Sequence, residues 1–463
     1  MATIFWFRRD LRLQDHPALN QAIVAAKQSD GRVFAVVSAR DYQDAQELSP
    51  TRQESLIQSW RELNESIGDE LTVLADPIAG IKSIAAREAI SDVFVSAAYD
   101  TRSVAFMKQA RVELESAGLK LTVGPGNYAV APGKVRKPDG TPYRVYTPFY
   151  KGWNELAWQA PVELETGAIW QRASEHQGFD SPAYPSEFAG VATSRRRIRA
   201  GEAFALRTLQ RFIDRGALAG YQEERNRADL AGTSHLSHAL AHGEIHPRTM
   251  LARLGQSNGE VTFAKELAWR EFYADVLWHN PNSLTDYLEP RFAKMRYDDG
   301  TELGESRLRA WKEGRTGYPM VDAGMRQLIA EGWVHNRVRM IVASFLVKDL
   351  HLEWQRGADW FETWLTDFDP ASNAHGWQWT AGCGTDASPY YRVFNPILQG
   401  LKFDPNGDYV RKYVPELRHI AGVAVHEPWL TVGFDSAGYP LPIVDHSTER
   451  NESLARLEEL KSL

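Results

Sequence analysis

Thr3-Ile4-Phe5-Trp6-Phe7 is the first of several short apolar or β-branched runs, and this series decides the fold. Further runs cover residues 32–37, 71–74, 92–96 and 120–123. Helical patterns at 17–27, 51–66, 79–90 and 103–116 lie between them. Such alternation predicts an α/β domain, with a doubly wound parallel sheet and helices on both faces. No G-x-G-x-x-G motif follows the first run, so ordinary dinucleotide binding there is unsupported.

The chain changes character after this series. Proline and glycine recur at 125–126, 132–133 and 138–140, followed by Pro161, Pro182 and Pro185, which is typical of a connecting segment. Later patterns have helical periodicity, at 203–215, 262–278, 305–313, 321–331, 334–350 and 360–366. The sequence therefore predicts an α/β domain over residues 1–128, an interdomain linker over 129–195 and an all-α domain over 196–463.

Composition indicates an ordinary folded protein. Of the 463 residues, 43% are hydrophobic and 24% are charged, as in ordinary globular proteins. The net charge of −7 disfavours a generally basic nucleic-acid coat protein but is compatible with a local basic groove. The single cysteine, Cys383, excludes a disulfide framework, a structural zinc site of several cysteines and a cysteine-ligated iron–sulfur cluster within the chain. The longest apolar run, residues 340–347, is too short for a membrane span, and charges begin at Arg8. We therefore expect a cytoplasmic protein.

Two motifs in the middle of the chain could bind a ligand. Thr233-Ser-His-Leu-Ser237 could cap a helix, or its hydroxyl and N–H groups could hold a phosphate. Glu266, Trp269 and Tyr273 share one helix face, which suits a flat polar ring. The alternative is an amphipathic helix with Trp269 in the core.

Two later motifs combine charge with aromatic rings. Asn336, Arg337 and Met340 fall on one side of a helix, with Arg339 nearly opposite Arg337, so they could grip a base and a phosphate or make ordinary salt bridges. The stretch from Asp367 to Trp379 reads as a turn leading into a helix, with Pro370 and Gly376 as turn and cap signals. Trp377 and Trp379, one residue apart, cannot both face one core, so one of them should face a cavity.

Together these motifs resemble the photolyase/cryptochrome family, and most of all its bacterial class I enzymes that repair cyclobutane pyrimidine dimers. The matching stretches are 4–13, 232–237, 269–273, 314–319, 333–340 and 377–395. The resemblance implies FAD in the helical domain and an antenna-type N-terminal domain. The residues that it implies for FAD are Tyr221, Thr233, Ser234, His235, Leu236, Ser237, Arg339, Asp367, Phe368, Asp369 and Asn373. Arg339 would pair with Asp367 beside the flavin ring, and Asn373 would face flavin N5.

The resemblance also implies damaged DNA as the partner. The residues that it implies for DNA and lesion binding are Arg225, Glu266, Trp269, Asn336, Arg337, Met340 and Trp379. A flipped-out lesion would be clasped by the two indoles and hydrogen-bonded by Glu266. Excited FADH⁻ would donate an electron that splits the dimer and then returns. We expect no membrane partner and no obligate protein partner, and hence a monomer.

The sequence departs from the family at two places. Trp377 and Trp354 match the inner electron relay, but Tyr297 stands where the family has a surface tryptophan, and Trp311 is the alternative end of the relay. The acid expected near Arg102 and Ser103 for a folate antenna is absent, so a deazaflavin, a folate or no antenna remain as alternatives. A cryptochrome-like blue-light receptor is the alternative function. Asn373 argues against it, because plant-type receptors tend to carry Asp there.

Overall fold

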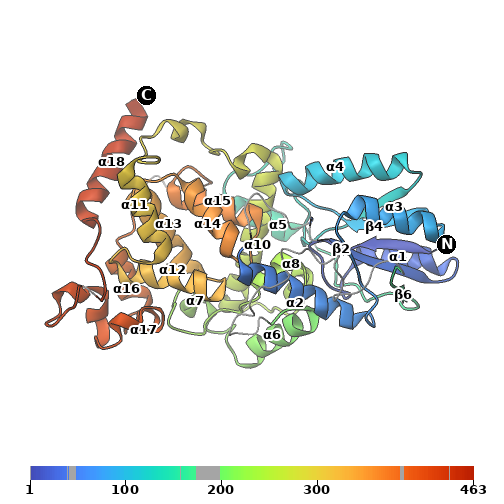
Figure 1. The fold of residues 1–463 in the computed structure, drawn as a ribbon, viewed down its shortest axis with the longest axis horizontal. Helices are drawn as coiled ribbons and strands as arrows, with labels where there is room; N and C mark the ends of the chain where they lie inside the picture. Colours follow the sequence, from blue (N-terminus) through green and yellow to red (C-terminus); the bar gives the residue numbers. More distant parts are fainter. Residues whose placement is uncertain are drawn as a thin grey trace. The chain divides into compact units, whose positions relative to one another are not determined.

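The sheet is parallel and doubly wound in the computed structural model (Figure 1). The structure describes residues 2–38, 40, 48–156, 158–173, 199–385, 391–436 and 438–462. Its strands are β1 (Thr3–Trp6), β2 (Arg32–Ser38), β3 (Thr72–Leu74), β4 (Asp92–Ser96) and β5 (Lys120–Gly124), in the order β3-β2-β1-β4-β5. The register pairs Ile4 with Phe34 on one side and with Val93 on the other. The predicted α/β architecture is confirmed.

Alternating side chains of β1 build a core on each face of the sheet. Phe5 and Phe7 pack with α1 (Pro17–Lys27) and α2 (Pro50–Ser66), where Trp60 is fully buried. Ile4 and Trp6 pack with α3 (Pro77–Glu88) and α4 (Thr101–Ser116). A strand buried on both faces reads as a continuous apolar run, as 3–7 does.

The chain divides into two compact units. The sheet unit comprises Met1–Tyr143, Thr147–Gly216 and Ser234–Pro281, and the helical unit comprises Arg144–Tyr146, Ala217–Thr233 and Asn282–Leu463. The predicted linker is partly regular: it contains α5 (Tyr146–Glu155) and β6 (Ile169–Gln171), and β6 extends the sheet by pairing with β2. Its residues 174–195 lie outside the described residues.

The sheet unit also holds helices that follow the linker. They are α6 (Glu202–Asp214), α8 (Ser237–His242), α9 (Pro247–Leu251) and α10 (Asn258–His279). A capping box at Ser257 and Glu260 starts α10. Further along α10, buried Glu271 accepts hydrogen bonds from Val130 N at 3.0 Å and Trp153 Nε1 at 2.5 Å. These contacts tie α10 to the segment that follows the sheet.

The helical unit contains no strand among its described residues. Its helices are α7 (Tyr221–Glu224), α11 (Glu302–Glu313), α12 (Pro319–Glu331), α13 (Asn336–Lys348), α14 (Trp354–Trp364), α15 (Pro370–Ala381), α16 (Pro396–Phe403), α17 (Asp408–Tyr413) and α18 (His446–Ser462). Short 3-10 helices at Pro281–Leu284, Pro290–Lys294, Pro415–Leu417, Gly422–His426 and Pro428–Leu430 connect them. Helix α13 packs against α12, α14 and α15, and its residues 341–348 are all buried. No helix in the described part of the chain has the length and apolarity needed to cross a membrane.

Candidate active site

Asp369 fixes the turn that opens α15. Its carboxylate accepts a 2.8 Å hydrogen bond from Ser372 N, and Pro370 occupies the first helical position. The preceding residues, Asp367 and Phe368, are buried in the same turn. The cap expected at Gly376 is wrong: that residue lies inside α15, and Gly382, at φ 89°, ends the helix, because a left-handed position there favours glycine.

Arg339 forms an ion pair with Asp367. Its Nη2 lies 2.7 Å from Asp367 Oδ2, and its Nε donates to the Val334 carbonyl at 2.8 Å. The Asp367 side chain is 1% exposed. Its Oδ1 is buried and has no hydrogen-bond partner in the described part of the chain. Leaving such an acceptor unsatisfied costs about 1–3 kcal/mol, so the arrangement fits a bound group that brings an N–H donor.

The amide of Asn373 is held by the backbone of α14. Its Nδ2 donates to the Ala358 carbonyl at 3.1 Å, which orients Oδ1 as the remaining acceptor. Asn373 follows Asp369 by one helical turn, and Asn373 N donates to Asp369 O at 2.9 Å. The two residues therefore share one face of α15.

Arg337 and Arg225 lie near each other in the helical unit. Asn226, the neighbour of Arg225, accepts hydrogen bonds from Arg337 Nε at 3.1 Å and Nη2 at 2.8 Å. The Arg337 guanidinium lies 4.6 Å from the Phe403 ring centroid. On the same helix as Arg337, Asn336 is exposed and Met340 is half-buried. The fixed guanidinium suits a phosphate contact better than a freely moving one.

Residues 221–237 cross from the helical unit to the sheet unit. Tyr221 is buried and lies 5.9 Å from the Arg225 guanidinium, whereas Thr233 and Ser234 are half-buried. The helix-capping interpretation of Thr233 to Ser237 is wrong, because α8 has Leu236 at its N-cap and no side-chain cap. His235 is exposed and has φ 54°, a left-handed value that costs about 1–3 kcal/mol in a non-glycine residue and recurs at functional sites.

Glu266, Trp269 and Tyr273 are half-buried on α10, in the sheet unit. The Trp269 and Tyr273 ring centroids lie 5.4 Å apart. The opposite, buried face of α10 carries Leu267 and Glu271. Trp269 is thus not a core residue, which leaves its indole on the partly open side of the helix.

Trp377 and Trp379 have different environments, as their spacing predicts. Trp377 is 3% exposed and packs on Phe361 with 5.1 Å between ring centroids. Trp379 is half-buried, and the Arg392 guanidinium lies 5.9 Å from its ring centroid. One indole is therefore part of the core and the other is partly open.

Tyr287 connects two residues expected in the electron relay and was missed by the sequence analysis. Its ring centroid lies 6.2 Å from that of Trp354 and 6.4 Å from that of Tyr297. Its hydroxyl donates to Glu353 Oε1 at 3.1 Å. Burial raises the pKa of both Tyr287 and Tyr297. Tyr287 lies between two 3-10 turns, where no periodic pattern could mark it.

Trp311 does not suit the solvent end of a relay. It is 0% exposed, and its Nε1 donates to the Val342 carbonyl at 3.0 Å. Its ring centroid lies 6.1 Å from that of Trp377, so it packs inside the helical unit.

Comparisons with known proteins identify the family of the chain. The family model of DNA photolyase matches residues 3–166, and the model of the FAD binding domain of DNA photolyase matches residues 263–459. A deoxyribodipyrimidine photo-lyase of Agrobacterium fabrum is 38% identical, over 99% of this chain and 98% of its own. A crystal structure of a class III photolyase from Agrobacterium tumefaciens matches with a TM-score of 0.85 and 35% identity, covering 100% of this chain and 98% of that one. A cryptochrome of Synechocystis sp. PCC6803 has a TM-score of 0.86 and 26% identity, with 98% of each chain covered.

The match to the FAD binding domain makes this a flavin-binding protein, which contains a parallel-sheet unit and a helical unit. The chain belongs to the photolyase/cryptochrome family and contains the family's FAD-binding domain. Its particular likeness to the class I enzymes stays a prediction, and the solved relative from Agrobacterium tumefaciens is a class III photolyase.

Proposed function

We propose that this enzyme is a deoxyribodipyrimidine photo-lyase that repairs cyclobutane pyrimidine dimers in DNA under light. The observation that carries the proposal is the Arg339–Asp367 ion pair, with one buried carboxylate oxygen still unsatisfied. Asn373 on α15 adds an amide that is oriented by its hydrogen bond to the Ala358 carbonyl. Relatives named deoxyribodipyrimidine photo-lyase over nearly the full chain support the same reaction.

FAD supplies the light-driven electron that splits the dimer. Asp367 would hold an N–H group of the cofactor through its open oxygen, while the 2.7 Å contact with Arg339 holds that carboxylate in place. Asn373 would present its Oδ1 as an acceptor toward the flavin. The remaining proposed contacts come from Tyr221, Thr233 to Ser237, Phe368 and Asp369.

The contacts proposed for the lesion follow from the family resemblance. We propose that Trp269 and Trp379 pack against its apolar side, that Glu266 hydrogen-bonds its polar edge, and that Asn336 and Met340 complete the pocket. A dimer is poorly stacked in the duplex, so flipping it out costs less than flipping an intact base. Arg225 and Arg337 would contact phosphates, which makes binding dependent on salt.

Electrons that restore the reduced cofactor would pass through Trp377 and Trp354 toward Tyr297. Tyr287 would bridge the last step, and Glu353 would accept its phenolic proton. The α/β domain, residues 1–128, would house any antenna chromophore, of folate or deazaflavin type, and residues 196–463 would form the catalytic domain. We expect a monomer in solution.

The test uses duplexes that carry either one cyclobutane thymine dimer or one (6-4) product. The FAD-loaded protein should bind both lesions more tightly than undamaged DNA, and blue light should convert only the cyclobutane dimer to two thymines, measured by chromatography of the digested DNA. Conversion of the (6-4) product alone would contradict the proposed substrate.

A blue-light receptor of the cryptochrome type is the second candidate, favoured by the similarity to the Synechocystis cryptochrome. A receptor would change its flavin state in light and leave both lesions intact. The same duplex experiment therefore separates the two functions.

A further inference from the structure

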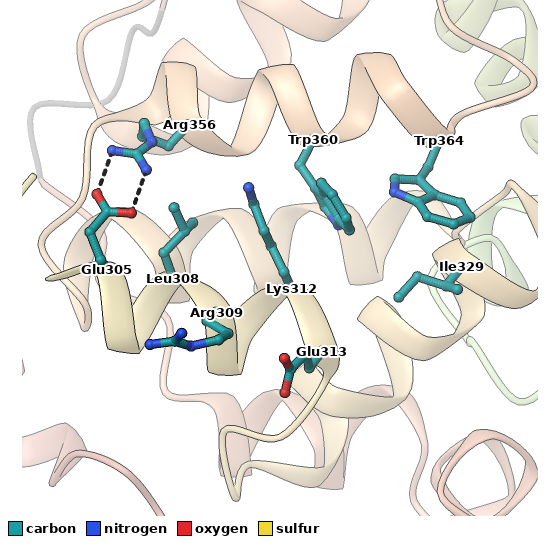
Figure 2. Close-up of a pocket in the computed structure, with 9 residues that line it drawn as sticks. All are labelled: Glu305, Leu308, Arg309, Lys312, Glu313, Ile329, Arg356, Trp360 and Trp364. Carbon is teal, nitrogen blue, oxygen red and sulfur yellow. Dashed lines mark hydrogen bonds and ion pairs between the residues drawn. The ribbon is translucent and has the colours of Figure 1, made fainter. Parts of the chain in front are cut away.

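A pocket of about 430 Å³ lies on the helical unit, and Figure 2 shows the side chains that line it. Trp360 and Trp364 come from α14, Leu308 and Lys312 from α11, and Ile329 from α12. This volume falls in the range of about 300–1,000 Å³ that small-molecule sites occupy. None of its lining residues belongs to the proposed flavin or lesion contacts.

The pocket uses a different face of α14 from the one that packs on Trp377. Phe361 meets Trp377 with 5.1 Å between ring centroids, and Gly357 lies against the same indole. Trp360 and Trp364, four residues apart, form a neighbouring stripe on the helix. Ligand contact with these two indoles would therefore leave the Trp377 side of α14 undisturbed.

Two half-buried indoles, inclined to each other, give the pocket an aromatic wall. The ring centroids of Trp360 and Trp364 are 5.6 Å apart, with the planes inclined by 55° (Figure 2). Leu308 and Ile329 add apolar contacts from α11 and α12. A planar ring gains both apolar burial and favourable ring–ring geometry on such a wall.

Cations outnumber carboxylates in the lining of the pocket, which contains Arg309, Lys312 and Arg356 beside Glu305 and Glu313. Lys312 Nζ lies 4.7 Å from the Trp360 ring centroid, and Lys312 has no ion-pair partner in the described part of the chain. Burial lowers the pKa of Lys312, and the nearby charge of Arg356 lowers it further. Glu305 is engaged by Arg356 through two hydrogen bonds of 2.9 Å each. Arg309 adds a further cation to the lining, and Glu313 adds a carboxylate.

We propose that this pocket binds a planar aromatic anion, a one- or two-ring aromatic or heteroaromatic molecule that carries a carboxylate or a phosphate. The ring packs against Trp360 and Trp364, and the acidic group meets Lys312 and Arg309. Glu305 and Asp359 act on Lys312 only from a distance, so a neutral ring would leave the half-buried ammonium without a direct ion pair. An anion without a ring would leave the indoles uncovered. The site is separate from DNA repair and goes beyond it.

The test is isothermal titration of the FAD-loaded full chain with 2-naphthoate. Two probes separate the parts of the proposal: 2-naphthalenemethanol has the ring without the charge, and cyclohexanecarboxylate has the charge without the aromatic ring. We expect 2-naphthoate to bind at one site per chain, and each of the other probes to bind about tenfold more weakly or worse. Absence of 2-naphthoate binding, or equal binding of either other probe, would overturn the proposal.

Variants locate the binding. Lys312→Gln should weaken 2-naphthoate about tenfold, and Trp360→Leu about fivefold. Lys412→Gln is the matched control, because Lys412 lies 4.5 Å from the Tyr413 ring centroid on α17 and lines no part of the pocket. It should leave the affinity unchanged. Flavin absorbance and circular dichroism verify that each variant is folded. If Trp360→Leu does not fold, the result for Lys312→Gln decides. An unchanged affinity of Lys312→Gln for 2-naphthoate would show that the ligand binds elsewhere.

Discussion

The ring of Tyr287 meets the indole of Trp354 edge-on, with 6.2 Å between their centroids. Tyr287 also hydrogen-bonds Glu353 at 3.1 Å and stacks on Tyr297. Oxidised phenols are strongly acidic, so in the proposed relay a carboxylate that accepts the phenolic proton would help to retain the positive hole away from the flavin. Tyr287 joins the rings of Trp354 and Tyr297 into one series of contacts, which we propose as the outer part of that relay.

Removing either phenol should slow light-driven reduction of the flavin by an external thiol. Tyr287→Phe keeps the ring but loses the proton contact with Glu353, and Tyr297→Phe removes the proposed terminal donor. We expect both variants to be several-fold slower than the wild type, and Trp354→Phe to be nearly inactive, as measured by the loss of oxidised-flavin absorbance. Wild-type rates in both tyrosine variants would show that the electrons enter by another route.

Asp367→Asn should release FAD and destabilise the helical unit. The change leaves Arg339 without its carboxylate partner, and breaking this largely buried pair should cost about 2 kcal/mol. We expect less than one FAD per chain by absorbance and a lower denaturant midpoint. Glu416→Gln is the control, since it breaks the more exposed Arg326–Glu416 pair in the same unit and should retain full FAD. Full FAD occupancy in Asp367→Asn would contradict the assigned contact.

Asn373→Asp should reduce the yield of fully reduced flavin. Aspartate cannot donate to the Ala358 carbonyl as Asn373 Nδ2 does, and it brings a charge or a proton source to that place. The flavin spectrum after illumination with thiol reports the yield. Asn395→Asp is a suitable control, because Asn395 caps α16 and aspartate caps equally well. Identical spectra for Asn373→Asp and the wild type would argue against contact with the flavin.

Arg337→Glu should weaken binding of damaged duplex and flatten its salt dependence. Loss of one phosphate contact lowers the slope of log affinity against log salt by about one, and the reversed charge lowers affinity further. Fluorescence anisotropy over a salt series measures both quantities. Arg111→Glu, on α4 of the sheet unit, serves as a surface-charge control. An unchanged slope for Arg337→Glu would remove this residue from the interface.

Asp404 should make the protein lose stability as the pH rises from about 4 to about 6. Burial raises its pKa to about 6, although the backbone N–H groups of Tyr409 and Val410, each at 3.0 Å, oppose that shift. Because the pKa of Asp404 is higher in the folded than in the unfolded state, the folded state binds more protons between about pH 4 and 6. The stabilisation that Asp404 contributes is therefore complete below about pH 4 and is lost as the pH passes about 6. The loss should be about 2 kcal/mol.

The measurement is the urea midpoint of the wild type and of Asp404→Asn across this pH range. The variant should lose less stability than the wild type, because its side chain does not titrate. Asp349, whose pKa burial also raises to about 6, is present in both proteins and cancels in the comparison. Parallel curves would contradict the raised pKa of Asp404.

Local sequence patterns predicted the sheet and most helices. Strands buried on both faces read as continuous apolar runs, and helices show a period of 3.6 residues. Strand β4 has the predicted bounds, Asp92–Ser96. Strand β6 escaped prediction because it has three residues and exists through its pairing with β2. Helix α14 begins at Trp354, six residues before the predicted pattern, after His351 adopts φ 56°.

One contact of the candidate site was predictable although its two residues lie 28 positions apart in the chain. The ion pair of Arg339 with Asp367 was expected from the family resemblance and is present. The partners of Asn373 and Arg337, Ala358 and Asn226, depend on tertiary packing that no local pattern records. The left-handed His235 and the bridging Tyr287 have no sequence signal for the same reason.

Single-turnover repair of a duplex that contains one cyclobutane thymine dimer tests the proposed photo-lyase activity. The reduced, FAD-loaded protein is mixed with the duplex and divided between blue light and darkness, and restored thymine is counted after digestion. The proposed activity predicts restoration in light alone, with strong loss in Trp269→Leu, whose indole lies on the partly open face of α10. A protein that binds FAD and the damaged duplex, absorbs the light and leaves the dimer intact would contradict it.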